Sequence, residues 1–95
     1  MVVRLESLRE EEIDAIFHAL ADATRRDIVA RVIEREQSVS GLAASYAMSF
    51  AAVQKHIAVL ERASLVVKSQ RGRERIVRAE PAAIARARAV LEHYE

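Results

Sequence analysis

One short segment in the middle of the chain combines side chains that form hydrogen bonds with side chains too small to block a close approach. Its members are Ser49, Ala51, Ala52, Gln54 and Lys55. The amide of Gln54 has the geometry to bridge N6 and N7 of adenine, and Ser49 can bond to a base or a phosphate. Lys55 is suited to a phosphate, where its charge adds affinity but little sequence information. These residues are typical of a surface that approaches base-pair edges.

A second group of basic residues follows further along the chain. Arg71, Arg73 and Arg75 surround Gly72 within five residues. Guanidinium groups at the tip of a loop can bond to phosphates or enter a narrow minor groove. We therefore predict that these three arginines form a second contact with DNA.

The distribution of charge agrees with a polyanionic partner. The whole chain has a formal net charge of +1. Residues 49–80 carry seven basic and three acidic side chains, whereas residues 1–37 carry six basic and nine acidic ones. The excess of positive charge therefore lies on the segment that holds both predicted contacts.

Other classes of function find little support in the sequence. The absence of cysteine excludes disulfides, thiolate metal sites and thiol catalysis. We find no nucleophile motif, acidic dyad, glycine-rich phosphate loop or cofactor fingerprint, so we expect neither an enzyme nor a cofactor. The apolar runs are too short to span a membrane and no signal peptide opens the chain, so we expect a cytoplasmic protein.

Hydrophobic periodicity indicates which elements hold the predicted contacts. We expect a single domain over residues 1–95, mainly α with a small β-hairpin. The predicted helices cover residues 8–20, 23–36, a short stretch after Ser40, 50–63 and 82–93, and the predicted strands cover a residue or two at Val39, then 65–70 and 74–80. This order, with two short helices before a basic hairpin, is typical of a winged helix-turn-helix.

Candidate caps and core residues fix the orientation of these elements. We predict that Asp22, Ser40 and Ser49 cap the helices that follow them, that Tyr46 lies in the short helix, and that Gly72 takes a positive φ. The apolar stripes are expected at Leu8, Ile13, Ile16, Phe17 and Leu20; at Ile28, Val29, Val32 and Ile33; at Val53, Ile57 and Leu60; and at Ile84, Ala87, Val90 and Leu91. His56 lies beside the third stripe, and a packed or hydrogen-bonded histidine is favoured there over a ligand.

Three ordered motifs resemble the ArsR/SmtB family of winged-helix repressors. IFHALADATRRDIVARV at 16–32 resembles the second helix of the family, MSFAAVQKHIAVLERASLV at 48–66 its recognition helix, and RGRERIVR at 71–78 its basic wing. The resemblance implies a homodimer in which the first and last helices pack across the two-fold axis. It also implies binding of double-stranded DNA at an inverted repeat, usually in the promoter of the protein's own operon.

The chain departs from the family pattern at several positions. Ala23 replaces the usual proline, and Ser64 replaces the usual glycine at the end of the recognition helix, where a left-handed backbone would cost serine about 1 kcal/mol. The family's Cys-x-Cys motif is missing from SVSGLAASY. The second metal site of the family would have only Glu92, His93 and Glu95 here, so no metal is expected.

One alternative keeps the same fold. A winged helix can serve as a protein interaction module without binding DNA, since the fold does not dictate the function. The small overall net charge favours this alternative. The basic hairpin and the open face of the predicted recognition helix favour DNA.

Overall fold

The computed structural model describes residues 9–94, which form five helices and three strands. The helices are α1 (Glu10–Leu20), α2 (Ala23–Glu34), α3 (Val39–Ala44), α4 (Phe50–Arg62) and α5 (Pro81–His93), and the strands are β1 (Gln37–Ser38), β2 (Val66–Arg71) and β3 (Glu74–Ala79). This order confirms the predicted winged helix-turn-helix. Leu8, which we predicted on the first apolar stripe, lies outside the described residues.

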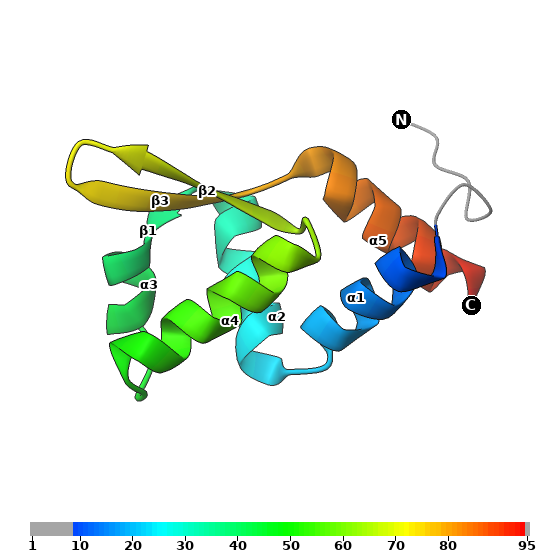
Figure 1. Cartoon of the computed structure of the whole chain (residues 1–95), viewed down its shortest axis with the longest axis horizontal. Coiled ribbons are helices and arrows are strands. Elements are labelled where there is room, and N and C mark those ends of the chain that lie inside the picture. The colour runs from blue at the N-terminus through cyan, green and yellow to red at the C-terminus, as the bar shows by residue number, and fades with distance from the viewer. Residues whose placement is uncertain (1–8, 95) are drawn as a thin grey trace.

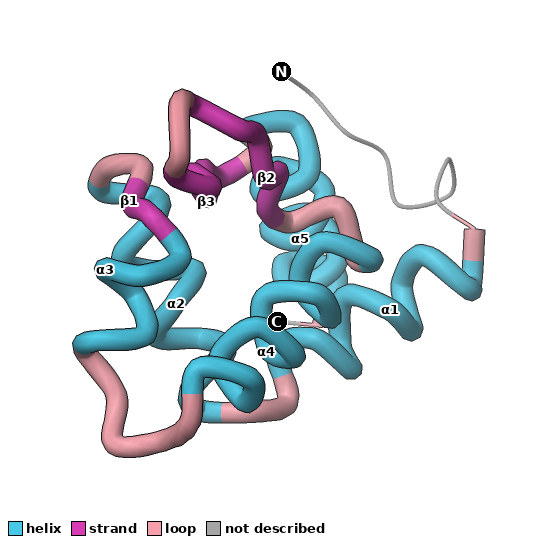
Figure 2. Tube along the Cα trace, turned by 60° about the vertical axis from the view of Figure 1, so that its left-hand side comes forward, coloured by secondary structure: helices cyan, strands magenta, loops and turns pink. Residues whose placement is uncertain are grey.

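The elements form an elongated molecule measuring 40 × 25 × 21 Å. Figure 1 shows the hairpin of β2 and β3 extending at one end, close to α3, while α1 and α5 lie at the other end. Helix α4 runs between these two ends, and Figure 2 shows the loop that joins it to α3. The predicted recognition helix therefore connects the end that carries the wing to the end that carries α1 and α5.

The three strands form an antiparallel sheet in the order β1-β3-β2. Val77 of β3 is paired with Gln37 on one side and with Lys68 on the other, so β3 is the central strand. Gly72 connects β2 to β3 with φ +63°, as predicted for a tight hairpin.

The core is formed by apolar residues from all five helices and from the sheet. Val53, Ile57 and Leu60 of α4 are each at most 1% exposed, which confirms the predicted buried stripe of this helix. They pack in one cluster with Ile28 of α2 and Leu42 of α3. Burial of this stripe orients α4, because the opposite face of the helix must then point outward.

The prediction for the start of α3 was wrong by two residues. The strand lies at Gln37–Ser38, and Val39, which we expected in a strand, is the first residue of α3. Ser38 caps the helix in place of Ser40, because its Oγ accepts a hydrogen bond from the backbone N–H of Gly41 at 2.9 Å. The earlier start brings the side chain of Val39 into the core, where it is 5% exposed. Tyr46 lies beyond the end of α3 and not within it.

Three residues of the predicted apolar stripes are exposed. Phe17 of α1 is 40% exposed, Ile33 of α2 is 53% exposed and Leu91 of α5 is 51% exposed. In α5 the buried positions are Ala83, Ala87 and Val90. Helical periodicity places apolar residues on one side of a helix, but the neighbouring elements decide how much of that side is covered.

The end of α4 takes the left-handed backbone that we considered for Ser64. This residue has φ +62°. The N–H of Ser64 donates to the carbonyl of Glu61 at 2.9 Å, and the N–H of Leu65 donates to the carbonyl of Leu60 at 3.0 Å. This pair of hydrogen bonds defines a Schellman motif, in which glycine is the usual residue at the left-handed position.

Among residues 9–94, no helix is both long enough and apolar enough to cross a membrane.

Candidate nucleic-acid interface

The start of α4 is fixed by a side-chain cap. The Oγ of Ser49 accepts a hydrogen bond from the backbone N–H of Ala52 at 3.1 Å, as predicted. A cap of this kind satisfies one of the free N–H groups at the first turn. The first turn of α4 is therefore held in a regular helical conformation, with its outer face in solvent.

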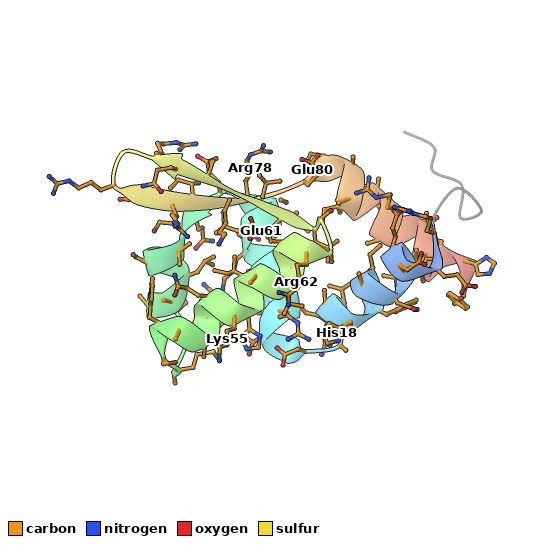
Figure 3. All side chains as sticks on the ribbon, in the orientation of Figure 1. His18, Lys55, Glu61, Arg62, Arg78 and Glu80 are labelled. Carbon is orange, nitrogen blue, oxygen red and sulfur yellow. The ribbon has the colours of Figure 1, made fainter. Side chains whose placement is uncertain are left out.

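The predicted reading residues lie together on this outer face. The side chains of Ala51, Gln54 and Lys55 are exposed, and Ala52 is half-buried. Figure 3 shows the position of Lys55 on α4. Phe50, the first residue of the helix, is 49% exposed. An exposed aromatic ring at this position can contact the methyl group of thymine.

The wing divides the three predicted arginines between its two faces. Arg71 is paired with Glu74, whereas Arg75 is paired with Gln70, the next pair along the ladder. Because successive pairs point to opposite faces of a sheet, Arg71 and Arg75 lie on opposite faces. Arg73 lies in the exposed turn between the strands. The sequence placed the three guanidinium groups close together along the chain but did not reveal this separation.

Arg75 faces α4. It lines a polar groove together with Glu61 of α4 and with Lys68 and Gln70 of β2. Lys68 is half-buried, and its Nζ lies 3.5 Å from Oε1 of Glu61. This ion pair links the wing to the second half of α4. Lys68 therefore helps to hold the wing against the helix, a role that the sequence pattern did not indicate.

Arg71 is engaged by an acidic residue on the other face. Its Nη1 donates to Oε1 of Glu36, the residue that precedes β1. This hydrogen bond raises the pKa of Arg71 and lowers the pKa of Glu36, which Arg78 lowers further. In Figure 3, Arg78 lies on the side of the hairpin opposite to α4. The predicted contact from Arg71 must therefore compete with a carboxylate of the same chain.

A polar cluster fastens the turn that precedes α4. The hydroxyl of Tyr46 donates to Oδ2 of Asp27 at 2.6 Å, and Nε of Arg31 donates to the same oxygen at 2.8 Å. Burial and the hydrogen bond to Asp27 raise the pKa of Tyr46 to about 12. The bond from Tyr46 is also the main reason that the pKa of Asp27 is lowered, and Arg31 contributes second. The turn is therefore anchored to α2.

His56 forms a hydrogen bond within the protein, as we favoured from the sequence. Its Nδ1 lies 3.2 Å from Nη1 of Arg25, and its side chain is 22% exposed.

The three histidines come from different helices, with His18 on α1, His56 on α4 and His93 on α5. Within residues 9–94 no group of three or more potential ligands is close enough to hold a metal ion.

Comparisons with known proteins agree with this geometry. The family model described as "Bacterial regulatory protein, arsR family" matches residues 22–68. The HTH-type transcriptional regulator Rv2034 of Mycobacterium tuberculosis is 36% identical over 81 residues, which cover 85% of this chain and 76% of that protein. The matched regions include α2, α3 and all of α4.

Solved structures share the fold. The crystal structure of the ArsR family transcriptional regulator RHA00566 has a TM-score of 0.82 and 31% identity, and the match covers 92% of this chain and 90% of that one. The homodimeric winged helix-turn-helix DNA-binding domain of Mb0332 from Mycobacterium bovis has a TM-score of 0.72 and covers 88% and 76% of the two chains. At 20% identity the second match is evidence for the fold alone.

The capped and exposed start of α4, the basic hairpin that follows this helix, and the identity to regulators over most of both chains lead to one assignment. The protein is a transcriptional regulator with a DNA-binding winged helix-turn-helix, and it belongs to the arsR family of bacterial regulatory proteins.

Proposed function

We propose that this protein is a homodimeric repressor that binds an inverted repeat in double-stranded DNA. The observation that carries the proposal is the face of α4 at residues 49–55, which is exposed and free of large aliphatic side chains. The second half of the same helix is linked to the basic wing through Glu61 and Lys68. Each subunit inserts this face into one major groove. Two subunits related by a two-fold axis then read half-sites about one helical turn apart.

The predicted contacts divide into base reading and phosphate binding. Gln54 bonds to a base edge, and Ala51 and Ala52 permit the close approach that this bond requires. Lys55 and Ser49 bond to phosphates or, for Ser49, to a base. Arg71, Arg73 and Arg75 extend the contact from the wing to the flanking backbone or minor groove.

Exposed apolar side chains support the dimer. Phe17 of α1 is 40% exposed, Leu91 of α5 is 51% exposed and Tyr94, just after α5, is 67% exposed. The rings of Phe17 and Tyr94 pack edge to face with centroids 6.1 Å apart, so they form one apolar area. The structurally similar domain of Mb0332 is a homodimer. Burial of this area against a second copy would remove it from water.

The mechanism that follows is steric. A dimer bound at a promoter occupies both the major grooves and the flanking backbone, and thereby blocks access of RNA polymerase. The family resemblance favours the promoter of the protein's own operon as the target.

Binding to that promoter tests the proposal directly. The purified protein is titrated into the upstream fragment and into a scrambled fragment, across a series of salt concentrations, and fluorescence anisotropy is recorded. We expect tight binding to the upstream fragment by two subunits, with affinity that falls steeply as salt rises, because the protein displaces counterions from phosphates. Equal or absent binding to both fragments would contradict the assignment of this target and would favour a protein partner.

Substitution of Gln54 tests the position of α4 in the groove. We expect Gln54→Ala to relax sequence preference at one or two base pairs, with a loss of about 1–3 kcal/mol on the preferred site. Arg73→Ala is the comparison, since loss of a phosphate contact should weaken binding to all sequences about equally. If Gln54→Ala changed neither affinity nor preference, this residue would not face the bases.

A further inference from the structure

Arg25 of α2 forms polar contacts with two other helices, α1 and α4. From α2, its Nε donates to the carbonyl of Ala19 at 2.7 Å and its Nη2 to the carbonyl of His18 at 2.8 Å. Both carbonyls belong to the last turn of α1, and the carbonyl of His18 also accepts the backbone N–H of Ala21 at 3.3 Å. The guanidinium therefore closes the end of α1 and places a positive charge where the helix dipole favours one.

The same guanidinium reaches α4. Its Nη1 lies 3.2 Å from Nδ1 of His56, the residue that follows Lys55. Because a guanidinium only donates, Nδ1 is the accepting nitrogen and the proton of the neutral ring is on Nε2. The half-buried position of His56 partly shields this contact from water. One side chain of α2 thus connects the end of α1 to the middle of the predicted recognition helix.

Asp22 fixes the backbone of Arg25 in the first turn of α2. Its Oδ2 accepts a hydrogen bond from the backbone N–H of Arg25 at 3.0 Å and lies 3.9 Å from Nδ1 of His56. The bond from the backbone N–H of Arg25 is the main reason that the pKa of Asp22 is lowered. The carboxylate therefore holds the first turn of α2, so that the Arg25 side chain starts from a fixed position.

The neighbouring Arg26 provides an internal comparison. Its Nη1 donates to the carbonyl of Leu20 at 2.7 Å, so it also closes the end of α1. Its side chain is exposed and is bonded to α1, whereas Arg25 is bonded to both α1 and α4. The two residues are identical in type and adjacent in the chain. They differ in the contact with the recognition helix.

Directional contacts matter here because apolar packing alone is not directional. Ala19 of α1 and Ile57 and Leu60 of α4 belong to the same buried cluster, which holds these helices together. Hydrophobic burial depends on the area removed from water and resists small rotations of a helix only weakly. A planar guanidinium, in contrast, presents its donors in a rigid fork and satisfies three acceptors in one arrangement only.

We propose that Arg25, through His56, is a positioning residue that fixes α4 relative to α1 and thereby sets the separation of the two half-sites. The inference rests on the proposed function, in which α1 lies at the dimer interface and α4 in the major groove. In such a dimer, the distance between the two recognition helices depends on how each is held relative to the interface.

Selection from a pool of random duplex DNA tests this role even when the operator is not known. The wild-type protein is expected to enrich sequences that contain two half-sites at one preferred separation. We expect Arg25→Lys to enrich the same half-sites over a broader range of separations, since a compact ammonium keeps the charge but cannot present the planar fork. The preference for the wild-type separation over one shifted by a single base pair should fall by about fivefold or more.

Two further variants make the result specific. Arg26→Lys preserves charge at the adjacent position and should select the same narrow distribution as the wild type. His56→Ala removes the acceptor on α4 and should broaden the distribution as Arg25→Lys does, and the double variant should broaden it no further. Circular dichroism during thermal unfolding establishes that each variant is folded at the selection temperature.

The outcomes separate this inference from the proposed function. If the wild-type protein enriched no pair of half-sites, the proposed function would fail. If it enriched them and folded His56→Ala kept the narrow distribution, the positioning role would be overturned, whatever the stability of the Arg25 variant. Equal broadening by Arg25→Lys and Arg26→Lys would also overturn it, because closure of α1 would then explain the effect.

Discussion

At the scale of the residue, the end of the recognition helix depends on a backbone conformation that serine tolerates poorly. Ser64 has φ +62° and supplies one of the two hydrogen bonds of the Schellman motif. For a residue with a Cβ, the left-handed region brings the side chain close to the backbone carbonyl. The same conformation carries no such penalty in glycine, which is the usual residue at this position.

We therefore predict that Ser64→Gly stabilises the protein. The expected gain is about 0.5–1 kcal/mol, since removal of the Cβ contact outweighs the greater freedom of glycine in the unfolded chain. The melting temperature measured by circular dichroism should rise by a few degrees.

Ser69→Gly is the matched control. Ser69 lies in β2, is exposed and has an ordinary extended backbone, so glycine there should lower the melting temperature. A lower melting temperature for Ser64→Gly would show that the side chain of Ser64 contributes more than its backbone conformation costs.

At the scale of the element, the wing carries positive charge on both faces, but the two faces are not equally available to bind phosphates. Arg75 shares a groove with Lys68 and faces α4, whereas Arg71 is bonded to Glu36 on the opposite face. An exposed ion pair contributes little to stability. The larger effect of this ion pair is on the affinity for a polyanion, because Glu36 both occupies the guanidinium of Arg71 and repels phosphates.

Release of Arg71 is expected to strengthen DNA binding. We predict that Glu36→Gln raises the affinity for DNA by about three- to tenfold at low salt and steepens the dependence of log affinity on log salt by about one unit, equivalent to one more phosphate contact. Fluorescence anisotropy across a salt series measures both quantities.

Glu34→Gln controls for the change in net charge alone. Glu34 is exposed, lies two residues before Glu36 at the end of α2, and changes the charge of the chain by the same amount. Its effect should be smaller and should leave the salt dependence nearly unchanged. Identical effects of the two substitutions would mean that Arg71 does not reach DNA when Glu36 is neutral.

At the scale of the whole molecule, the wing and the start of α4 lie at one end and helices α1 and α5 lie at the other (Figure 1). Helices α1 and α5 carry exposed apolar side chains. Leu91 and Tyr94 lie at the end of α5, and Phe17 lies on α1 beside Tyr94. A small domain gains stability from burying such side chains against a second copy. The proposed dimer therefore places its interface away from the DNA contact.

A charge introduced at Leu91, in this apolar end, should separate the subunits. We predict that Leu91→Glu converts the dimer into a monomer at micromolar concentration and lowers DNA affinity at least about tenfold, since one subunit then has a single half-site to bind. Sedimentation equilibrium measures the oligomeric state.

Met48→Glu is the corresponding control for sedimentation. Met48 is 37% exposed and lies in the turn before α4, far along the chain from α1 and α5. It should leave the oligomeric state unchanged. A dimeric Leu91→Glu variant would place the interface elsewhere on the molecule.

Predictions from sequence succeeded where the determining contacts lie within a few residues. The caps at Asp22 and Ser49, the positive φ of Gly72 and the buried stripe of α4 are all confirmed. The start of α3 was wrong, because Ser38 and Ser40 are equally good caps and only burial of Val39 distinguishes them. The eight predicted DNA contacts stay predictions, and the structure adds that Arg71 is engaged by Glu36.

The sequence by itself determined the order of the elements, the caps at Asp22 and Ser49 and the face of α4 that points outward, because these depend on periodicity and on hydrogen bonds between near neighbours. Tertiary structure alone decided the contacts of Arg71 with Glu36 and of Arg25 with His56, which are 35 and 31 residues apart in the chain. It also decided that Leu91 stays exposed. The physical reason is that such distances and exposures depend on how whole elements pack, which no local pattern of residues records.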